Sequence, residues 1–237
     1  PVGVIKDPNP SDLPPSTWDD VKNVRFQNGK TLKSQGHESV FPTPEAPPLH
    51  TMPYLSQNTP YWLSASSGKI HRTEGSTWVD VSRTVGGDYN AVIDHNWNGG
   101  FLNQVAILNN KNDIPQSLQP TNSTFQDLPH WPVGYRAEVI RPFKNYLVAL
   151  NITNNSVDQP TTVKWSSPAD PGEVPFTWDV SDATNDAGES FLADTPGAIV
   201  DGKKLKDSFI IYKEDSVYAM RYIGGVFIFQ FQQLFDD

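Results

Sequence analysis

Three short stretches place a carboxylate one or two residues after a tryptophan, and these are the first residues to weigh for chemistry. They are Thr17-Trp18-Asp19-Asp20, Thr77-Trp78-Val79-Asp80 and Thr177-Trp178-Asp179. Glycoside hydrolysis needs two carboxyl groups roughly 5 to 10 Å apart across a sugar. Asp19 and Asp20 are adjacent, so in a strand they would point to opposite faces. No spacing pairs Asp80 with Asp179, and the pattern favours packed tryptophans followed by solvated acids.

A related glycosidase signal lies in the segment Thr73-Glu74-Gly75-Ser76-Thr77-Trp78. It partly resembles the Asp-box turn of sialidases, whose form is roughly S-x-D-x-G-x-T-W. The glycine, threonine and tryptophan fit this form, whereas the serine and the aspartate are missing. A sialidase-like glycosidase therefore stays open as an alternative.

The histidines show no metal-ligand spacing, and the chain has no cysteine. Asp94-His95 is the nearest thing to a paired acid–base or metal site, but neighbours in a strand face apart. Neither a Walker-type phosphate loop nor a G-x-S-x-G nucleophile elbow is present. We therefore predict no catalytic residue, no metal, no cofactor and no enzymatic activity. The five histidines are His37, His50, His71, His95 and His130.

Aromatic residues offer another chemistry, the stacking of sugars. Trp97, Trp131 and Trp178 are candidates for stacking on sugars, and Trp97 and Trp178 lie beside asparagine or aspartate, as in carbohydrate-binding sites. Loop tryptophans also serve as packing residues or subunit contacts. A carbohydrate-binding adhesin is thus the second alternative to a purely structural protein.

The elements that would position these residues are short strands. Alternating or β-branched runs are separated by turn signals every 8–12 residues or so, which is typical of an all-β sandwich, barrel or propeller. The signals Gly86-Gly87, Gly99-Gly100 and Gly224-Gly225 are expected to be tight turns. The predicted strands cover Tyr61–Leu63, Lys69–His71, Trp78–Val81, Asn90–Ile93, Gln104–Leu108, Ala137–Ile140, Asn145–Leu150, Thr161–Trp165, Ser208–Tyr212, Ser216–Met220 and Val226–Phe231.

One pattern recurs along the chain: a large apolar residue, any residue, Asn or Asp, then alternating apolar residues. Its Asn/Asp positions are Asn103, Asn145 and Asp207, at spacings of 42 and 62, with a weaker copy near residues 59–63. A period in the low forties is what a four-stranded propeller blade occupies. The longer spacing fits an insertion, for which the polar segment Ser167–Asp186 is the candidate surface loop. We predict an all-β, propeller-like fold in which Asn/Asp closes a turn before an inner strand.

The first fifty residues differ from the rest because closely spaced prolines prevent regular pairing. Only residues 21–26 and 30–32, joined by Asn28-Gly29, are expected to form a hairpin. We therefore predict an extended proline-rich arm over residues 1–50 and a propeller-like domain of short antiparallel strands over residues 51–237. The arm would lie along the domain or on a neighbouring subunit.

Composition limits the partners. The formal charge of −9 argues against a general phosphate-clamping nucleic-acid binder, which needs a basic face. No apolar run reaches the roughly 18 residues of a membrane helix, so we expect no membrane segment.

The arm carries a family resemblance. Asp12-Leu13-Pro14-Pro15, Trp18 and Asn23–Lys30 resemble the "LPP…W…NVRF.DG" opening of tail nozzle proteins, also called tail tubular proteins, of short-tailed (podovirus-like) bacteriophages. Further stretches are similar in the same order, so the resemblance spans most of the chain. They are residues 109–116, 128–132, 142–150, 163–168 and 209–220.

The resemblance implies a β-propeller-containing structural virion protein. Nozzle subunits form a homo-oligomeric ring, commonly of six copies, below the head–tail connector (adaptor), where the ring extends the DNA-ejection channel and helps to anchor tail fibres. DNA would pass without specific binding, and an acidic lining would repel its phosphates. The arm and the 167–186 loop are expected to contact other subunits or fibres. Because nozzle proteins are usually much longer, we expect further blades to follow in the parent protein.

Overall fold

Strands and turns make up nearly all of the regular structure. The computed structural model describes residues 3–36, 38–182, 184–225 and 227–236. Within these residues the only helix is one 3-10 turn, η1 (Pro10–Asp12), so the all-β prediction is confirmed. No helix in this described part is long and apolar enough to cross a membrane. Two compact units divide the chain, Pro1–Phe41 and Pro42–Asp237, and each is described by itself.

The first unit consists of two small pairs of strands. β1 (Gly3–Val4) pairs in parallel with β2 (Thr17–Trp18), and β3 (Val24–Gln27) forms an antiparallel hairpin with β4 (Lys30–Lys33). The hairpin is the predicted one, because Asn28 and Gly29 take the positive φ angles, 50° and 71°, that a two-residue turn needs. None of the unit's described residues is buried. This unit therefore folds without a hydrophobic core.

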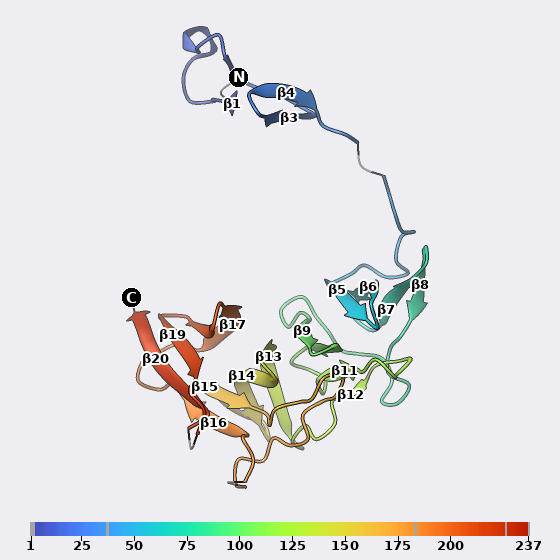
Figure 1. Cartoon of the computed structure of the whole chain (residues 1–237), viewed down its shortest axis with the longest axis vertical. Helices are drawn as coiled ribbons and strands as arrows, with labels where there is room; N and C mark the ends of the chain where they lie inside the picture. The colour runs from blue at the N-terminus through green and yellow to red at the C-terminus, as the bar shows by residue number, and fades with distance from the viewer. Residues whose placement is uncertain (1–2, 37, 183, 226, 237) are drawn as a thin grey trace. The chain divides into compact units, whose positions relative to one another are not determined.

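The second unit contains four sheets of four strands each, and within each sheet every strand pairs antiparallel with the next one along the chain. Residues 42–49, which the sequence grouped with the arm, belong to this unit. Figure 1 shows the four sheets following one another from cyan to red. The strands are β5 (His50–Ser56), β6 (Thr59–Ala65), β7 (Ile70–Glu74) and β8 (Thr77–Asp80); β9 (Asn98–Leu102), β10 (Val105–Asn109), β11 (Gln116–Leu118) and β12 (Gln126–Asp127); β13 (Tyr135–Phe143), β14 (Tyr146–Asn154), β15 (Val157–Trp165) and β16 (Gly188–Phe191); β17 (Ile199–Leu205), β18 (Ser208–Lys213), β19 (Ser216–Tyr222) and β20 (Phe229–Asp236).

Neighbouring sheets pack through three buried apolar clusters, which supply the main driving force for folding. The first cluster joins Leu63 and Ile70 of the first sheet to Leu108 of the second. A second cluster joins the second and third sheets, and a third joins the third and fourth. The first strands of successive sheets also lie next to one another, β5 beside β9, β9 beside β13 and β13 beside β17.

The repeated sequence pattern falls at the same place in three sheets. Asn103, Asn145 and Asp207 each lie in the two-residue turn between the first and second strand of a sheet. Asn103 is the first residue of its turn, whereas Asn145 and Asp207 are the second. The predicted repeat is therefore present as a hairpin, but the alignment of its first copy was one residue out of register.

Gly99-Gly100 was wrongly predicted as a turn, because both residues belong to β9. A Cβ atom on Gly99 would lie 2.0 Å from the carbonyl oxygen of Ile107, and one on Gly100 would lie 2.6 Å from the ring of Pro142. Glycine is needed here so that β9 can approach β10 and β13 closely. The strand predicted at Asn90–Ile93 is also wrong, since these residues form part of the irregular connection from β8 to β9.

The 167–186 segment connects β15 to β16, and its described residues form no strand, as predicted. It is not wholly a surface loop. Ser167, Ala169 and Trp178 are buried, and the last two belong to the cluster between the second and third sheets. The insertion therefore contributes to the core.

Candidate functional site

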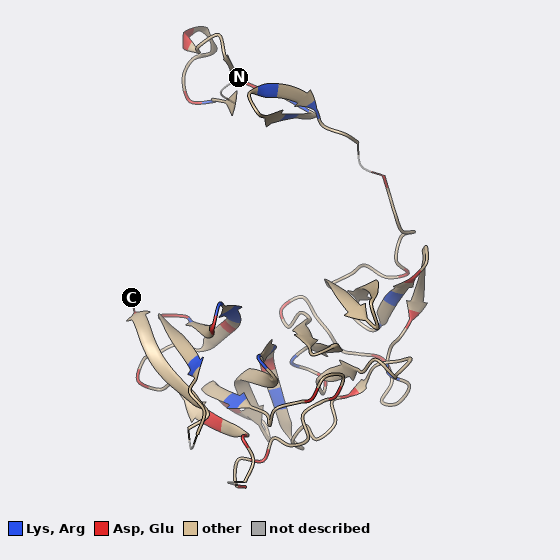
Figure 2. Cartoon of the chain, viewed as in Figure 1, with Lys and Arg blue, Asp and Glu red and all other residues tan. Residues whose placement is uncertain are grey.

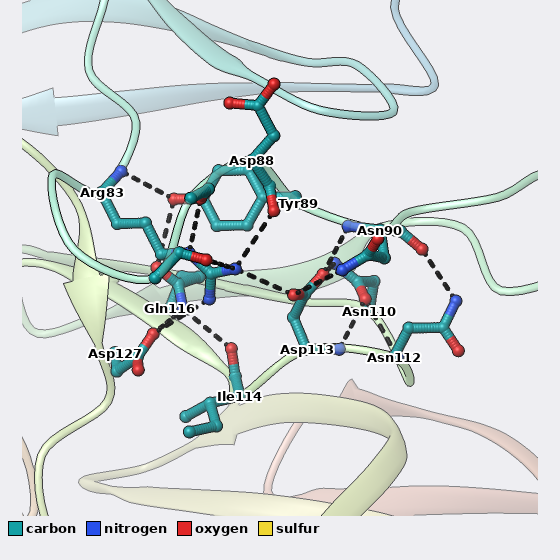
Figure 3. Close-up of polar contacts among 12 residues, drawn as sticks. Arg83, Asp88, Tyr89, Asn90, Asn110, Asn112, Asp113, Ile114, Gln116 and Asp127 are labelled. Carbon is teal, nitrogen blue, oxygen red and sulfur yellow. Dashed lines mark hydrogen bonds and ion pairs between the residues drawn. The ribbon is translucent and has the colours of Figure 1, made fainter.

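The connection from β8 to β9 folds around the side chain of Arg83, of which only 8% is exposed. Its Nε donates to the carbonyl oxygen of Gly87 at 3.1 Å, and its Nη2 reaches the carbonyl oxygen of Asp88 at 3.3 Å. The guanidinium also lies 4.6 Å from the centre of the Tyr89 ring. Figure 3 shows these groups converging on one charged side chain. A buried arginine thus fixes the path of this connection.

Asp113, 6% exposed, is the buried counter-charge of Arg83. One carboxylate oxygen accepts from Arg83 Nη2 at 3.0 Å, and the other accepts from the backbone N–H of Asn90 at 2.7 Å and from Asn110 Nδ2 at 3.1 Å. Asp127 accepts from Arg83 Nη1 at 3.2 Å on the more exposed side (Figure 3). The network therefore links the connection to β11 and β12 of the second sheet.

Arg83 and Asp113, the two buried charged groups of this network, have their hydrogen bonds made. Each nitrogen of the Arg83 guanidinium donates, and both oxygens of Asp113 accept. Neither group is available as a base or a nucleophile, because its protons and lone pairs are already engaged. The network acts as a structural tie, and nothing in the sequence spacing predicted it.

A second charged group lies where the first strands meet. Arg141 of β13 forms a bidentate ion pair with Asp201 of β17, in which Nε donates to Oδ1 at 3.0 Å and Nη2 donates to Oδ2 at 2.9 Å. Its Nη1 donates to the carbonyl oxygen of Gly99 in β9 at 2.9 Å. Burial, and then the positive charge of Arg141, lowers the pKa of His50 in β5 below its ordinary value of 6.5. One arginine thus connects three first strands and influences the fourth.

Asp94 and His95, the nearest thing to a paired site in the sequence, do not pair with each other among the contacts of the described residues. His95 Nδ1 instead lies 3.1 Å from Glu138 Oε1, and Lys111 Nζ lies 3.0 Å from the other oxygen of the same carboxylate. Within the described residues, no group of three or more His, Asp or Glu is placed to hold a metal. His37 lies outside the described residues. The remaining two histidines lie apart from each other. His71 is in β7, with Nε2 3.6 Å from Glu45 Oε2, and His130 is exposed in the turn before β13.

Of the acids considered for glycoside hydrolysis, Asp80 is the last residue of β8 and Asp179 lies in the β15–β16 connection. Ser82 donates its backbone N–H to Asp80, and its hydrogen bonds outweigh the raising effect of partial burial, so the pKa of Asp80 is lowered. The hydroxyl and backbone N–H of Ser181 likewise lower the pKa of Asp179. A glycosidase acid needs a raised pKa to hold its proton, so neither carboxyl group has that property. Asp19 is bonded only locally, to the backbone N–H of Asp20.

The tryptophans considered for sugar stacking are buried. Trp97 is 3% exposed, Trp131 8% and Trp178 2%, so none presents a ring face to solvent and the stacking hypothesis is wrong for all three. The indole N–H of Trp97 donates to Ser66 O, and that of Trp131 donates to Tyr135 O. Trp178 Nε1 is different, because it is buried and makes no hydrogen bond to any described residue.

Trp178 lines an open pocket of about 440 Å³ beside β13 and β15. The pocket is also lined by His130, Tyr135, Lys164 and Phe176, with Asp179 at the same loop. It combines donors, an acceptor and aromatic rings, which is the usual make-up of a small-molecule site. Of these residues, sequence reasoning had singled out His130, Trp178 and Asp179, but for other roles.

No protein-family model and no curated protein sequence matches this chain. Its function is therefore argued from the geometry above and from the resemblance in the sequence.

Proposed function

We propose that the chain is a structural protein of a short-tailed bacteriophage, built from propeller-type blades and assembled into a ring. The blade arrangement is supported by four sheets of identical strand order, packed face to face, whose first strands are neighbours. In a propeller the first strands surround the central axis and the faces of successive blades bury one another. The observation that carries the assembly role is the apolar surface left on the two end sheets.

The outer face of the first sheet exposes an apolar strip. Pro53 lies opposite Trp62 in the β5–β6 register, and Leu55 lies opposite Pro60. These residues point away from the core, because the alternate residues Tyr54 and Leu63 belong to the buried cluster. Trp62 is 46% exposed and Leu55 is 48% exposed.

The outer face of the last sheet has a matching strip. Tyr212, Val217 and Phe235 are aligned across β18, β19 and β20. Their neighbours along the strands, Ile211 and Tyr218, are buried in the cluster shared with the third sheet, so this row faces outward. Phe235 is 62% exposed. Both end faces thus continue the kind of surface that the inner sheets bury, and a contact between the end faces of two copies would cover both strips.

Such a head-to-tail contact produces a ring when its rotation closes. The first unit, in which no described residue is buried, would gain a core by packing on a further protein surface. In the proposed tail these surfaces belong to other copies, six in a ring by family resemblance, to the connector and to the tail fibres. The site of action is then the virion tail.

The first strands would face the channel through which DNA is ejected. They carry Arg136, Arg141, Lys203 and Lys204 against Glu138 and Asp201, and Figure 2 shows both signs of charge on β13 and β17. Arg141 and Asp201 are paired, so their charges cancel. The overall charge of −9 therefore comes mainly from other elements, and repulsion of DNA by an acidic lining is not a feature of these four strands.

Native mass spectrometry of the full chain, alone and with its connector, tests the proposal. A complex of several copies is expected, and Phe235→Asp should reduce it to single chains because it charges the outer face. Val133→Asp is the matched control, since Val133 is 95% exposed in a turn away from both strips. A chain that stays monomeric with and without the connector contradicts the proposed ring.

A further inference from the structure

The last strand of the fourth sheet, β20, has one edge without a partner strand. It pairs with β19 and with no other described strand (Figure 1). The outer strands of the other three sheets have two or four residues, whereas β20 has eight. Folded proteins usually protect such an edge by a short strand, a charge or a proline. The segment from Phe229 to Leu234 contains neither a charged residue nor a proline, so this edge is long and unprotected.

The hydrogen bonds between β19 and β20 show which main-chain groups point outward. The N–H of Ile223 donates to the carbonyl oxygen of Ile228 at 3.0 Å, just before the paired part of the two strands. Hydrogen-bonded and non-hydrogen-bonded pairs alternate along an antiparallel ladder. The main chains of Gln230 and Gln232 therefore bond to β19. The residues whose N–H and C=O groups point away from β19 are Phe229, Phe231 and Gln233.

The side chains of these three residues lie on the inner face of the sheet. Phe229 is buried in the cluster shared with the third sheet, and Phe231 packs against that cluster. Gln233 lies opposite Tyr218, which belongs to the same cluster. Beside Phe229 and Trp165 lies an open pocket of about 710 Å³, so the third sheet does not fill the space on this side of the strand.

The regular part of β20 is centred on Phe231. A bulge follows Gln233, where the pairing with Tyr218 and Val217 shifts by one residue. When two copies of β20 run antiparallel with Phe231 opposite Phe231, Phe229 of each copy lies opposite Gln233 of the other. Each outward-pointing residue then meets another one, and side chains of the inner face meet each other. No like charges face one another in this register, so the strand is complementary to itself.

We propose that β20 pairs antiparallel with β20 of a second copy about a two-fold axis at Phe231, which joins the two fourth sheets into one continuous sheet. The contact is isologous and uses the edge of the sheet, whereas the proposed ring uses the outer faces, so neither contact requires the other. One strand from each copy makes a small interface, and the expected dissociation constant is on the order of 100 µM. At the roughly micromolar concentrations of native mass spectra the pair therefore dissociates.

Disulfide trapping tests the register of the pair, because the chain contains no cysteine. Phe231→Cys places two thiols opposite each other at a Cα separation of about 5.5 Å, within the range of a disulfide. Gln233→Cys is the matched control on the same face, since its two copies would lie about 13 Å apart along the strands. Oxidation at about 0.5 mM chain, several times the dissociation constant, should yield a covalent dimer for the first variant and none for the second.

Sedimentation equilibrium of Phe235→Asp, which removes the proposed outer-face contact, measures the edge pair alone. Adding Gln233→Pro deletes an outward N–H and leaves the bonds to β19 in place, and should weaken the pair about tenfold or more. Adding Gln233→Ala keeps the N–H and should change little. Gln233 is exposed, so these two variants keep the test decisive if Phe231→Cys unfolds the chain.

Three results would overturn the proposal. The first is a Phe235→Asp chain that stays monomeric at about 0.5 mM. The second is equal cross-linking of Phe231→Cys and Gln233→Cys, which would show collision without a register. The third is a pair that is as tight with Gln233→Pro as with Gln233→Ala, because main-chain bonding at the edge would then play no part.

Discussion

Replacing Asp113 with asparagine tests whether the buried Arg83 network stabilises the second unit. The carboxylate accepts from Arg83 Nη2 on one oxygen and from the N–H of Asn90 on the other, at 3.0 and 2.7 Å. An amide of the same size accepts on only one atom and carries no charge. Removing one partner of a buried ion pair costs about 3–5 kcal/mol. Because Asp127 remains bonded to Arg83, we expect a loss at the lower end, about 3 kcal/mol.

Asp127→Asn is the matched control on the same guanidinium. The Asp127 side chain is 46% exposed, and exposed ion pairs contribute about 0–1 kcal/mol. Urea unfolding followed by tryptophan fluorescence gives both free energies, since Trp97 packs 5.0 Å from the Tyr89 ring and reports on this region. Equal losses in the two variants, or a loss below about 1 kcal/mol for Asp113→Asn, would refute the reasoning.

Three further predictions concern other parts of the chain. Gly99→Ala should cost about 3 kcal/mol or more in urea unfolding, because its Cβ would meet a backbone oxygen at 2.0 Å, whereas Gly87→Ala meets no neighbouring atom and should cost less. Because the pKa of His50 is lowered in the folded chain, the unfolded chain binds the proton more readily, and stability falls as the pH drops below about 6.5. His50→Asn should flatten that part of a plot of thermal midpoint against pH. An unchanged plot would show that His50 does not contribute to the pH dependence. Deleting residues 1–41 should weaken assembly in native mass spectra and leave the unfolding free energy of the second unit unchanged, because none of the described residues of the deleted unit is buried. Unaltered assembly would remove the arm's proposed role.

The hairpin turns were predictable because their residues are local signals. Asn28-Gly29 and the turns at Asn103, Asn145 and Asp207 combine a turn residue with alternating apolar residues on the following strand. Such signals need only a few consecutive residues. The positions of these four turns along the chain could therefore be obtained from the sequence.

The strands that sequence reasoning missed have their local signal overridden by packing. β9 contains Gly99-Gly100, which resembles a turn until the closeness of Ile107 and Pro142 is known. β5 contains Pro53, which lies opposite Trp62 on the outer face of the sheet. Proline and glycine were given their usual meaning there, and tertiary contacts decided otherwise.

The polar sites could not be predicted because their members are far apart in sequence. Arg83 and Asp113 are 30 residues apart, and Arg141 and Asp201 are 60 apart. Each pair meets only after the sheets have packed. The unpartnered N–H of Trp178 has no sequence signal at all, since the same residue type in Trp97 has an acceptor.

Electron cryo-microscopy of the particle assembled from the full chain tests the central claim most directly. The account predicts a ring in which β5, β9, β13 and β17 lie nearest the central DNA-ejection channel. It also predicts that the strips at Trp62 and Phe235 are covered by protein. Single chains whose two end strips remain open to solvent would contradict it.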